Sequence, residues 1–500
     1  MFYRTQRDNM DVVFWNDCPY PKKNLGLVFR YSGPYKIAHY VRDNGFSAQV
    51  IDYVTNFTQD ELLEFTLKFV NEETLALGIS TTFISQHEYE VDGSIARISE
   101  PMRNVLRIVK EKFPKLKIIL GGHLSDKVSG WGLVDGVVTG YGEDIFLELL
   151  QHYKTGSTPP HFKLNTSLWS NKIVRNYYEA ESPKYNIEHD NFKFVKEDCI
   201  LPNDTLPLEL SRGCIFKCKF CAFPLLGRGK LDYLRSFECV KEELVYNYEN
   251  FGVTNYYILC DTFNDTEYKV SEWHKMLTSL PFKINYTTYL RADLLHRFPD
   301  MIYQLKESGL LGAYHGLESL HPEASSIIGK GWSGKQAKDF IPELYHHRWG
   351  GQVAQHLNFI VGLPKDTSES MLDTIKWYKQ NNLHSISFDP LSMSAPGASR
   401  YNALSEFEKD SEKYGFTFDE NGNWKNAEWD EASAISFAKD LNGLVKTQNK
   451  MNSWTIMSFL GLGFSKQELL SATRNKFPWR EAIKGKREYV KLYKSMLRDL

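Results

Sequence analysis

The stretch Leu210-Ser-Arg-Gly-Cys214-Ile-Phe-Lys-Cys218-Lys-Phe-Cys221 carries the strongest signal for fold and chemistry in this chain. Its three cysteines, spaced Cys-x3-Cys-x2-Cys, lie on a predicted loop that directly follows a β-rich run. Three thiolates this close repel one another unless a metal centre compensates their charge, and Gly213 lets the backbone turn tightly around such a centre. The stretch therefore predicts a metal site at the end of a strand.

The number of ligands restricts the kind of metal centre. A structural zinc site needs a fourth ligand, and the nearest other cysteines, Cys199 and Cys239, lie outside zinc-ribbon spacing. A four-iron cluster held by three cysteines leaves one iron with an open coordination position, as a catalytic cluster needs. A binding module in which the three cysteines hold structural zinc is the non-enzymatic alternative.

Composition excludes several other classes of protein. The 500 residues are 42% hydrophobic and 24% charged, which is typical of folded globular chains. The formal net charge of -2 gives the whole chain no attraction for nucleic acid or an anionic membrane. Seven cysteines are too few for a disulfide framework and suit a reducing compartment. The apolar runs fall far below the roughly 18 residues that span a bilayer, so we expect a cytoplasmic protein.

The length predicts about three domains at roughly 150 residues each. Residues 1–154 alternate β-rich and helical runs, as in a doubly wound, Rossmann-like α/β sheet. Ligands of such sheets bind beyond the carboxyl ends of the strands. The predicted strands are Val12–Trp15, Ala48–Val54, Leu75–Ser80, Lys117–Gly122 and Gly136–Gly142. The predicted helices are Tyr35–Asn44, Asp60–Val70, Pro101–Phe113 and Glu143–Tyr153.

Three further segments follow. Residues 155–206 contain several prolines and predict a connector with little regular core. Residues 207–400 resume the alternation, and their six predicted strands favour a partial (β/α)6 barrel. Residues 401–500 lose the strand pattern and predict a helical region. Its acid-rich stretch Tyr401–Asp440 and base-rich stretch Arg474–Leu500 are expected to be solvated or to pair with each other, rather than to form a nucleic-acid patch. The predicted barrel strands are Leu208–Ser211, Tyr256–Asp261, Lys283–Leu290, Ala313–Ser319, His356–Pro364 and Ser385–Ser392.

The cysteine spacing, with the aromatic Phe220 before the last cysteine, resembles the radical S-adenosylmethionine (SAM) superfamily across roughly residues 207–400. The resemblance implies that Cys214, Cys218 and Cys221 hold a four-iron four-sulfur (4Fe-4S) cluster whose open iron binds SAM. It also implies cleavage of SAM to a 5′-deoxyadenosyl radical. An electron donor such as flavodoxin or ferredoxin is the expected protein partner.

Four later segments match this family in order and spacing. Asp261 begins a segment that resembles the one near the SAM amino group, and Arg291 lies in one that resembles the basic element near the carboxylate. Glu318 and Ser319 resemble the fourth-strand element that meets ribose and carboxylate, and Asn358–Pro364 resembles the adenine contact. The resemblance thus implies cofactor-binding roles for these residues. A surface ion pair for Arg291 and a helix N-terminal position for Glu318 are the local alternatives.

The N-terminal domain resembles the cobalamin-binding domain that precedes the radical domain in one large subgroup of the family. Glycines after its predicted strands allow a large ligand to approach the backbone closely. The Asp-x-His-x-x-Gly element that supplies a cobalt-ligating histidine in many cobalamin proteins is absent, and His39 and His123 lie in other contexts. The resemblance implies that cobalamin is bound by Ser80, Thr81, Gly121, Gly122, Gly140, Gly142 and Glu143.

These resemblances together imply a radical SAM enzyme that transfers a methyl group, with cobalamin, to an unactivated position of a small-molecule or peptide substrate. A radical SAM enzyme without cobalamin, catalysing cyclisation, rearrangement or oxidation, is the alternative. In that case the N-terminal domain serves interaction or gating. The methylthiotransferase branch is disfavoured because its N-terminal domain has three cysteines, whereas this one has only Cys18.

Overall fold

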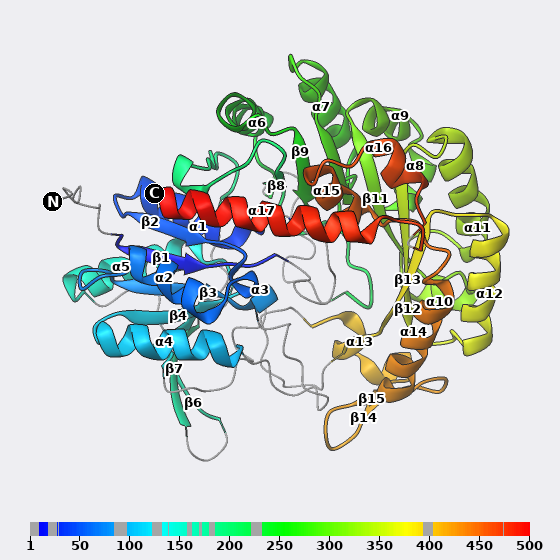
Figure 1. The fold of residues 1–500 in the computed structure, drawn as a ribbon. Helices are drawn as coiled ribbons and strands as arrows, with labels where there is room; N and C mark the ends of the chain where they lie inside the picture. The colour runs from blue at the N-terminus through cyan, green and yellow to red at the C-terminus, as the bar shows by residue number, and fades with distance from the viewer. Residues whose placement is uncertain are drawn as a thin grey trace.

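A computed structural model describes residues 10–18, 28, 30–84, 98–122, 133–138, 140–157, 163–169, 173–179, 186–221, 233–393, 404–473 and 475–500. Two large sheets lie on opposite sides of the molecule, and the long helix α17 (Trp479–Asp499) runs from one to the other (Figure 1). The predicted fold class, a doubly wound α/β sheet followed by a partial barrel and a helical region, is confirmed. Within the described residues, no helix is both long and apolar enough to cross a membrane.

The N-terminal sheet has the strand order β2-β1-β3-β4-β5-β7-β6, and its first five strands are parallel. The order reverses between β1 and β3, the point at which doubly wound sheets bind their ligands. Helices α1 and α5 pack together, as do α2 and α4. The strands are β1 (Val12–Trp15), β2 (Ala48–Ile51), β3 (Ala76–Ser80), β4 (Lys117–Gly121), β5 (Gly136–Val138), β6 (Lys163–Trp169) and β7 (Ile173–Glu179). The helices are α1 (Ser32–Asp43), α2 (Gln59–Phe69), α3 (Thr81–Ile84), α4 (Glu100–Lys112) and α5 (Glu143–Thr155).

The segment 155–206 is more regular than the sequence predicts. Strands β6 and β7 form an antiparallel hairpin, and β7 pairs in parallel with β5 at Val138 and Tyr178. The hairpin therefore extends the N-terminal sheet instead of belonging to an irregular connector. Its prolines and polar residues concealed this pairing because edge strands need no continuous apolar pattern.

The second sheet has the order β13-β12-β11-β10-β9-β8, and all neighbouring strands are parallel. With β8 and β13 as its edges, it forms the predicted open barrel. The strands are β8 (Thr205–Glu209), β9 (Asn255–Leu259), β10 (Asn285–Tyr289), β11 (Leu310–Glu318), β12 (Ala354–Val361) and β13 (Ser385–Pro390). The helices are α6 (Phe237–Phe251), α7 (Glu267–Thr278), α8 (Ala292–Arg297), α9 (Asp300–Glu307), α10 (Pro322–Ile327), α11 (Gly334–Glu343) and α12 (Ser368–Gln380).

Local capping sets the helix boundaries. Thr58 and Glu61 form a capping box, so α2 begins one residue before the predicted start. The Ser236 hydroxyl accepts a hydrogen bond from the Cys239 amide, which sets the start of α6 at Phe237. Gly252, at φ 68°, ends α6 in the left-handed conformation that glycine adopts without strain.

The C-terminal region is mostly helical, as predicted, and part of it fills the barrel. Helix α15 packs against β8 through β12, and Thr205 in β8 donates to the Met457 carbonyl at 2.8 Å. A Cβ at Gly312 would lie 2.5 Å from the Cβ of Ser453, so only glycine fits beneath this helix. The elements are α13 (Glu406–Lys409), β14 (Thr417–Phe418), β15 (Trp424–Lys425), α14 (Glu431–Val445), α15 (Ser453–Gly461), α16 (Lys466–Ser471) and α17.

Among the described residues, no ion pair joins the acid-rich and base-rich C-terminal stretches. The bases of α17 instead contact α2: Lys494 pairs with Glu61 at 2.6 Å and Arg498 with Glu64 at 3.1 Å. The pairing fails because the apolar face of α17, including Tyr493, packs into the core of the N-terminal domain. Burial of that face, and not net charge, decides where the helix docks.

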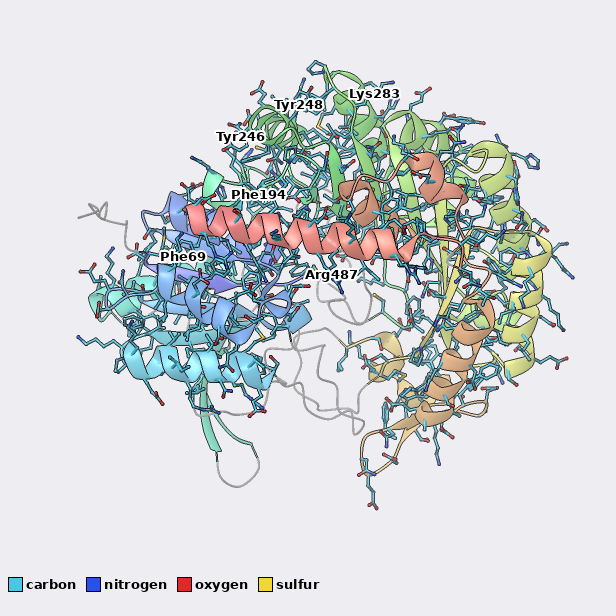
Figure 2. All side chains as sticks on the ribbon, in the orientation of Figure 1. Phe69, Phe194, Tyr246, Tyr248, Lys283 and Arg487 are labelled. Carbon is cyan, nitrogen blue, oxygen red and sulfur yellow. The ribbon has the colours of Figure 1, made fainter. Side chains whose placement is uncertain are left out.

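A buried cation joins the N-terminal domain, the connector and α17. Arg30 is 1% exposed and donates to Asp204 at 2.9 Å, to the Tyr35 hydroxyl at 2.6 Å and to the carbonyls of Asp198 and Cys199. Tyr489 on α17 donates to the same Asp204. Figure 2 shows Phe194, from the connector, below Tyr246 of α6, whose hydroxyl donates to the Phe194 carbonyl at 3.0 Å. The two sheets are thus joined by packed, hydrogen-bonded structure.

We expect Arg30→Gln to lower the free energy of unfolding by about 3–5 kcal/mol, because it leaves Asp204 buried without its cation. Urea denaturation of the full chain measures the change. Arg498→Gln, which removes an exposed pair with Glu64, is the matched control and should change little. Equal stability of the two variants would contradict this role for Arg30.

Candidate functional site

The three-cysteine loop begins where β8 ends, at the carboxyl edge of the barrel. Cys214 is buried, and its Sγ lies 3.4 Å from the Thr262 hydroxyl. Burial raises the pKa of the Cys214 thiol. Cys218 and Cys221 are half-buried, and the Cys221 amide donates to the Cys218 carbonyl at 3.1 Å. The loop therefore presents one buried and two more accessible sulfur ligands.

Asp261 supports the backbone of this loop. It follows β9, and its carboxylate accepts a hydrogen bond from the Gly213 amide. Gly213 has φ +91°, a conformation that favours glycine, directly before Cys214. Burial raises the pKa of Asp261 to about 6. The residue expected near the SAM amino group thus contacts the cysteine loop itself.

Arg291 brings a positive charge to the cysteines. It is 8% exposed, and its Nη1 donates to the Cys218 Sγ at 3.6 Å. Asp293 accepts two hydrogen bonds from the same guanidinium, which also lies 4.0 Å above the Phe216 ring. The predicted alternative of a surface ion pair is wrong, because the Arg291–Asp293 pair is buried beside the loop. The guanidinium therefore lies directly beside one of the three predicted cluster ligands.

Glu318 ends β11 in a strained conformation. Its φ of +67° is uncommon for a residue other than glycine. Lys330 donates to Glu318 at 2.6 Å and to the Gly316 carbonyl at 2.5 Å, and its Nζ lies 5.8 Å from the Phe220 ring centre. Ser319 donates to Asp366. The alternative of a helix N-terminal acid at Glu318 is wrong, since Glu318 belongs to a buried ion pair.

The concave wall of the barrel carries polar side chains next to this edge. Asn358 donates to Asp389 at 2.6 Å and to Ser387 at 3.0 Å, and His356 contacts the Ser385 and Ser387 hydroxyls at 2.8 Å. Burial lowers the pKa of His356 to about 3, which keeps this imidazole neutral. Asn358, expected at the adenine contact, is thus part of a hydrogen-bonded strip across β12 and β13.

Four of the predicted cobalamin residues meet at the carboxyl edge of the N-terminal sheet. Ser80 ends β3, Gly121 ends β4, and Thr81 donates to the Gly121 carbonyl at 3.0 Å. Gly122 has φ +100°, and a Cβ there would lie 2.5 Å from the Thr82 hydroxyl. The backbone at this edge is therefore so closely packed that only glycine fits at position 122. His123 lies outside the described residues, and His39 contacts Asp43 at 3.3 Å on α1.

The other three predicted cobalamin residues precede or begin α5. Gly140 has φ +89°, and a Cβ at Gly142 would lie 2.5 Å from the Ile37 side chain. Glu143 is 5% exposed and forms an ion pair with Arg212, two residues before Cys214. Contacts within the protein therefore explain why glycine stands at position 142 and a glutamate at position 143, without a ligand.

Arg212 connects the two carboxyl edges. Its Nε donates to Glu209 at 2.8 Å at the end of β8, it pairs with Glu143 at the start of α5, and its guanidinium lies 4.3 Å above the Tyr141 ring. Lys36 of α1 also pairs with Glu209. The loop that bears the cysteines is thereby held against the N-terminal domain. We refer to Arg212, Glu209, Glu143 and Lys36 as the edge network.

Sequence reasoning did not assign Arg212, Lys330 or Asn264. Asn264 exchanges two hydrogen bonds with the Arg291 backbone, at 2.8 and 2.9 Å, and so fixes the start of α8. Arg212 lies within the stretch Leu210–Cys221, and its place two residues before Cys214 could have indicated a role at the site. The sequence around Lys330 gave no such indication, because its partner Glu318 is twelve residues away, at the end of β11.

Among the described residues, no group of three or more His, Cys, Asp or Glu side chains converges closely enough to share one metal ion. Each thiolate of a three-cysteine cluster binds a different iron, so the cysteines of such a site need not converge on a single ion. The loop, with its adjacent guanidinium and hydroxyl, fits a cluster of this kind.

Comparison with known proteins identifies the middle of the chain. Residues 208–378, which include the three-cysteine loop and most of the barrel, match the family model described as the radical SAM superfamily. It is 28% identical over 263 residues to an uncharacterised methyltransferase of Pyrococcus horikoshii, covering 51% of this chain and 55% of that protein. The chain thus spans about half the length of this curated relative.

Two solved structures share the fold. The methyltransferase TsrM from Kitasatospora setae, with cobalamin and a 4Fe-4S cluster bound, has a TM-score of 0.61 at 13% identity, over 96% of this chain and 100% of that chain. The cobalamin-dependent radical enzyme OxsB, with aqua-cobalamin and SAM bound, has a TM-score of 0.56 at 15% identity, over 81% of this chain and 56% of that chain. The arrangement of two sheets and a helical region is therefore a known one.

We expect Arg212→Gln to speed amide hydrogen exchange in residues 210–221 and at the start of α5, because it removes the cation that neutralises Glu143. Exchange measured by mass spectrometry should leave α12 unchanged. Arg348→Gln, which breaks the partly exposed pair with Glu343, is the control. Unchanged exchange at both segments would show that the edge network does not hold the loop.

Proposed function

We propose that this chain, a radical SAM protein by its middle domain, binds a 4Fe-4S cluster through Cys214, Cys218 and Cys221, binds SAM beside it, and binds cobalamin at the N-terminal sheet. It then transfers a methyl group to an unactivated position of a substrate. A reducing compartment such as the cytoplasm suits this cluster, and a flavodoxin- or ferredoxin-like protein is the proposed electron donor.

One observation carries the proposal. The edge network joins the carboxyl edge of the barrel, where the cysteine loop starts, to the carboxyl edge of the N-terminal sheet. Ligands of open parallel sheets bind beyond these edges. Two cofactors held at two such edges therefore lie on the same side of both sheets, as a reaction between them requires.

The residues around the cysteines suit a low-potential cluster and its ligand. When bound, the cluster supplies one electron for SAM cleavage, and cobalamin supplies a carrier for the methyl group. Arg291 places positive charge at Cys218, which offsets the negative charge of the thiolates. Lys330 and Glu318 form a buried pair at the end of β11, where a zwitterionic ligand such as SAM finds both signs of charge.

The concave wall of the barrel provides the surface for substrate. Tyr289 and Tyr314, whose ring centres lie 4.8 Å apart, and Trp454 of α15 form an aromatic floor below the polar strip of His356 and Asn358. Such a surface excludes water and orients a substrate by a few hydrogen bonds.

A specific observation favours one alternative, a radical SAM enzyme without cobalamin. Gly142 and Glu143, two of the residues expected to contact cobalamin, are engaged by Ile37 and Arg212. The likeness to TsrM and OxsB supports the cobalamin form, and the four residues at the β3 and β4 edge suit a large flat ligand. Cobalamin binding distinguishes the two.

After anaerobic reconstitution with iron, sulfide and reductant, we expect about four irons per chain and release of 5′-deoxyadenosine or another SAM cleavage product. Alanine at Cys214, Cys218 or Cys221 should abolish the cluster spectrum and SAM cleavage together. Cys239→Ala, on α6 outside the loop, is the matched control. One zinc per chain without iron or sulfide would sink the proposal.

We expect Arg291→Gln to lower the reduction potential of the cluster and to slow SAM cleavage by about 10–100-fold, because it removes the charge beside Cys218. Arg291→Lys keeps the charge, so its reduction potential should lie closer to that of the wild type. Potentiometric titration followed by electron paramagnetic resonance measures both variants. Equal potentials for wild type and Arg291→Gln at full iron content would refute this role.

Incubation with hydroxocobalamin tests the second cofactor. We expect one corrinoid per chain, measured by its absorbance, to remain bound to the protein after gel filtration. Gly122→Val should lose it, because a side chain there collides with Thr82 and enters the predicted binding edge. Gly443→Val, at an exposed position of α14 where an added Cβ would have no atom within 4 Å, controls for general instability. A wild type with an intact cluster and no retained corrinoid would favour the alternative without cobalamin.

A further inference from the structure

A cavity of about 790 Å³ lies at the amino ends of β11 and β12, the end of the barrel opposite the cysteine loop. Its volume falls in the range of small-ligand sites. Helix α16 of the C-terminal region, the end of α9 and the segment 350–353 before β12 surround it. Figure 1 shows α16 beside α9 and β11. Nothing in the proposed reaction uses this cavity.

The cavity has an apolar floor and a cationic rim. Leu310, Leu311, Val353 and Tyr345 are buried at its base. Lys306, Lys450, Lys466 and His346 also line it. An apolar floor with a few charged groups is the usual composition of a site for a small organic ligand.

The lining contains no acidic residue. The acids nearest in sequence have other partners: Glu307 pairs with His274 at 2.9 Å, and Glu343 pairs with Arg348 at 2.8 Å. Glu468 accepts hydrogen bonds from Ser465 in a capping box. No acidic side chain in the lining therefore neutralises the positive charge of the rim lysines.

Lys466, on the rim, lies near the charge of a further lysine, Lys283. Partial burial, together with the charge of Lys283, lowers its pKa. Figure 2 shows Lys283 at the outer edge of the barrel, so this charge adds to that of the rim. Lys450 donates to the Tyr345 hydroxyl at 3.2 Å, which directs it over the floor. An anion placed here would relieve the repulsion between Lys466 and Lys283.

We propose that this cavity binds a small organic phosphate, with its apolar group on Tyr345 and Leu311 and its phosphate between Lys306 and Lys466. Phosphate carries up to two charges and accepts hydrogen bonds from several lysines at once. The compact volume fits one small molecule better than an extended acidic peptide. This inference does not rest on the proposed methyl transfer, because the cavity lies at the far end of the barrel.

Calorimetric titration of the full chain with phenyl phosphate tests the proposal, since this probe lacks the adenosine of SAM and should not enter the radical site. We expect binding at or below about millimolar concentration, weaker binding of inorganic phosphate and none of phenol. Binding should weaken as salt concentration rises, because lysines at an open rim are screened.

The double variant Lys306→Gln/Lys466→Gln should bind phenyl phosphate at least about tenfold more weakly than wild type. Lys335→Gln, an exposed lysine of α11 outside the cavity, should bind as wild type does. Thermal unfolding of all three proteins confirms that they are folded. No binding to wild type, equal binding to the double variant, or binding of an acidic peptide but not of phenyl phosphate would overturn the proposal.

Discussion

The position of Arg212 is the constraint on which the rest of this site depends. Its guanidinium pairs with Glu209 of the barrel and Glu143 of the N-terminal domain, two residues before the first cysteine of the loop. A guanidinium can satisfy two carboxylates at once because its donors are arranged in a planar fork. A buried pair of this kind is stable only when both partners are present, so neither edge can move without the other. The cysteine loop therefore keeps a fixed place relative to both sheets.

The helical C-terminal region also fixes the position of the two sheets relative to each other. Helix α15 fills the barrel interior, and α17 packs into the N-terminal core, where Tyr489 reaches the same Asp204 that neutralises Arg30. Asp204 directly precedes β8 and Glu209 ends it, so the partners of Arg30 and Arg212 lie at opposite ends of this strand. Two separate buried charge clusters thus fasten the same pair of sheets, which restricts their relative rotation.

The sequence predicts this molecule well wherever the signal is local. Strand periodicity placed the strands of both sheets, apart from the hairpin of β6 and β7, and Cys-x3-Cys-x2-Cys identified the loop. Long-range pairing was not predictable: Arg212 meets Glu143 across 69 positions, and Arg30 meets Asp204 across 174. The same limit applies to α17, whose charge suggested an acidic partner in the tail, whereas its apolar face selected the N-terminal core. The buried pair of Glu318 with Lys330 was likewise not predictable, because no local pattern links the end of β11 to that lysine.

Anomalous X-ray diffraction at the iron and cobalt edges, from crystals of the chain reconstituted anaerobically with iron, sulfide and cobalamin, tests the central claim most directly. We expect iron density bound to Cys214, Cys218 and Cys221. We also expect cobalt density beyond the carboxyl ends of β3 and β4, on the same side of the edge network as the iron. Iron bound elsewhere, or cobalt density remote from that edge, would contradict the account.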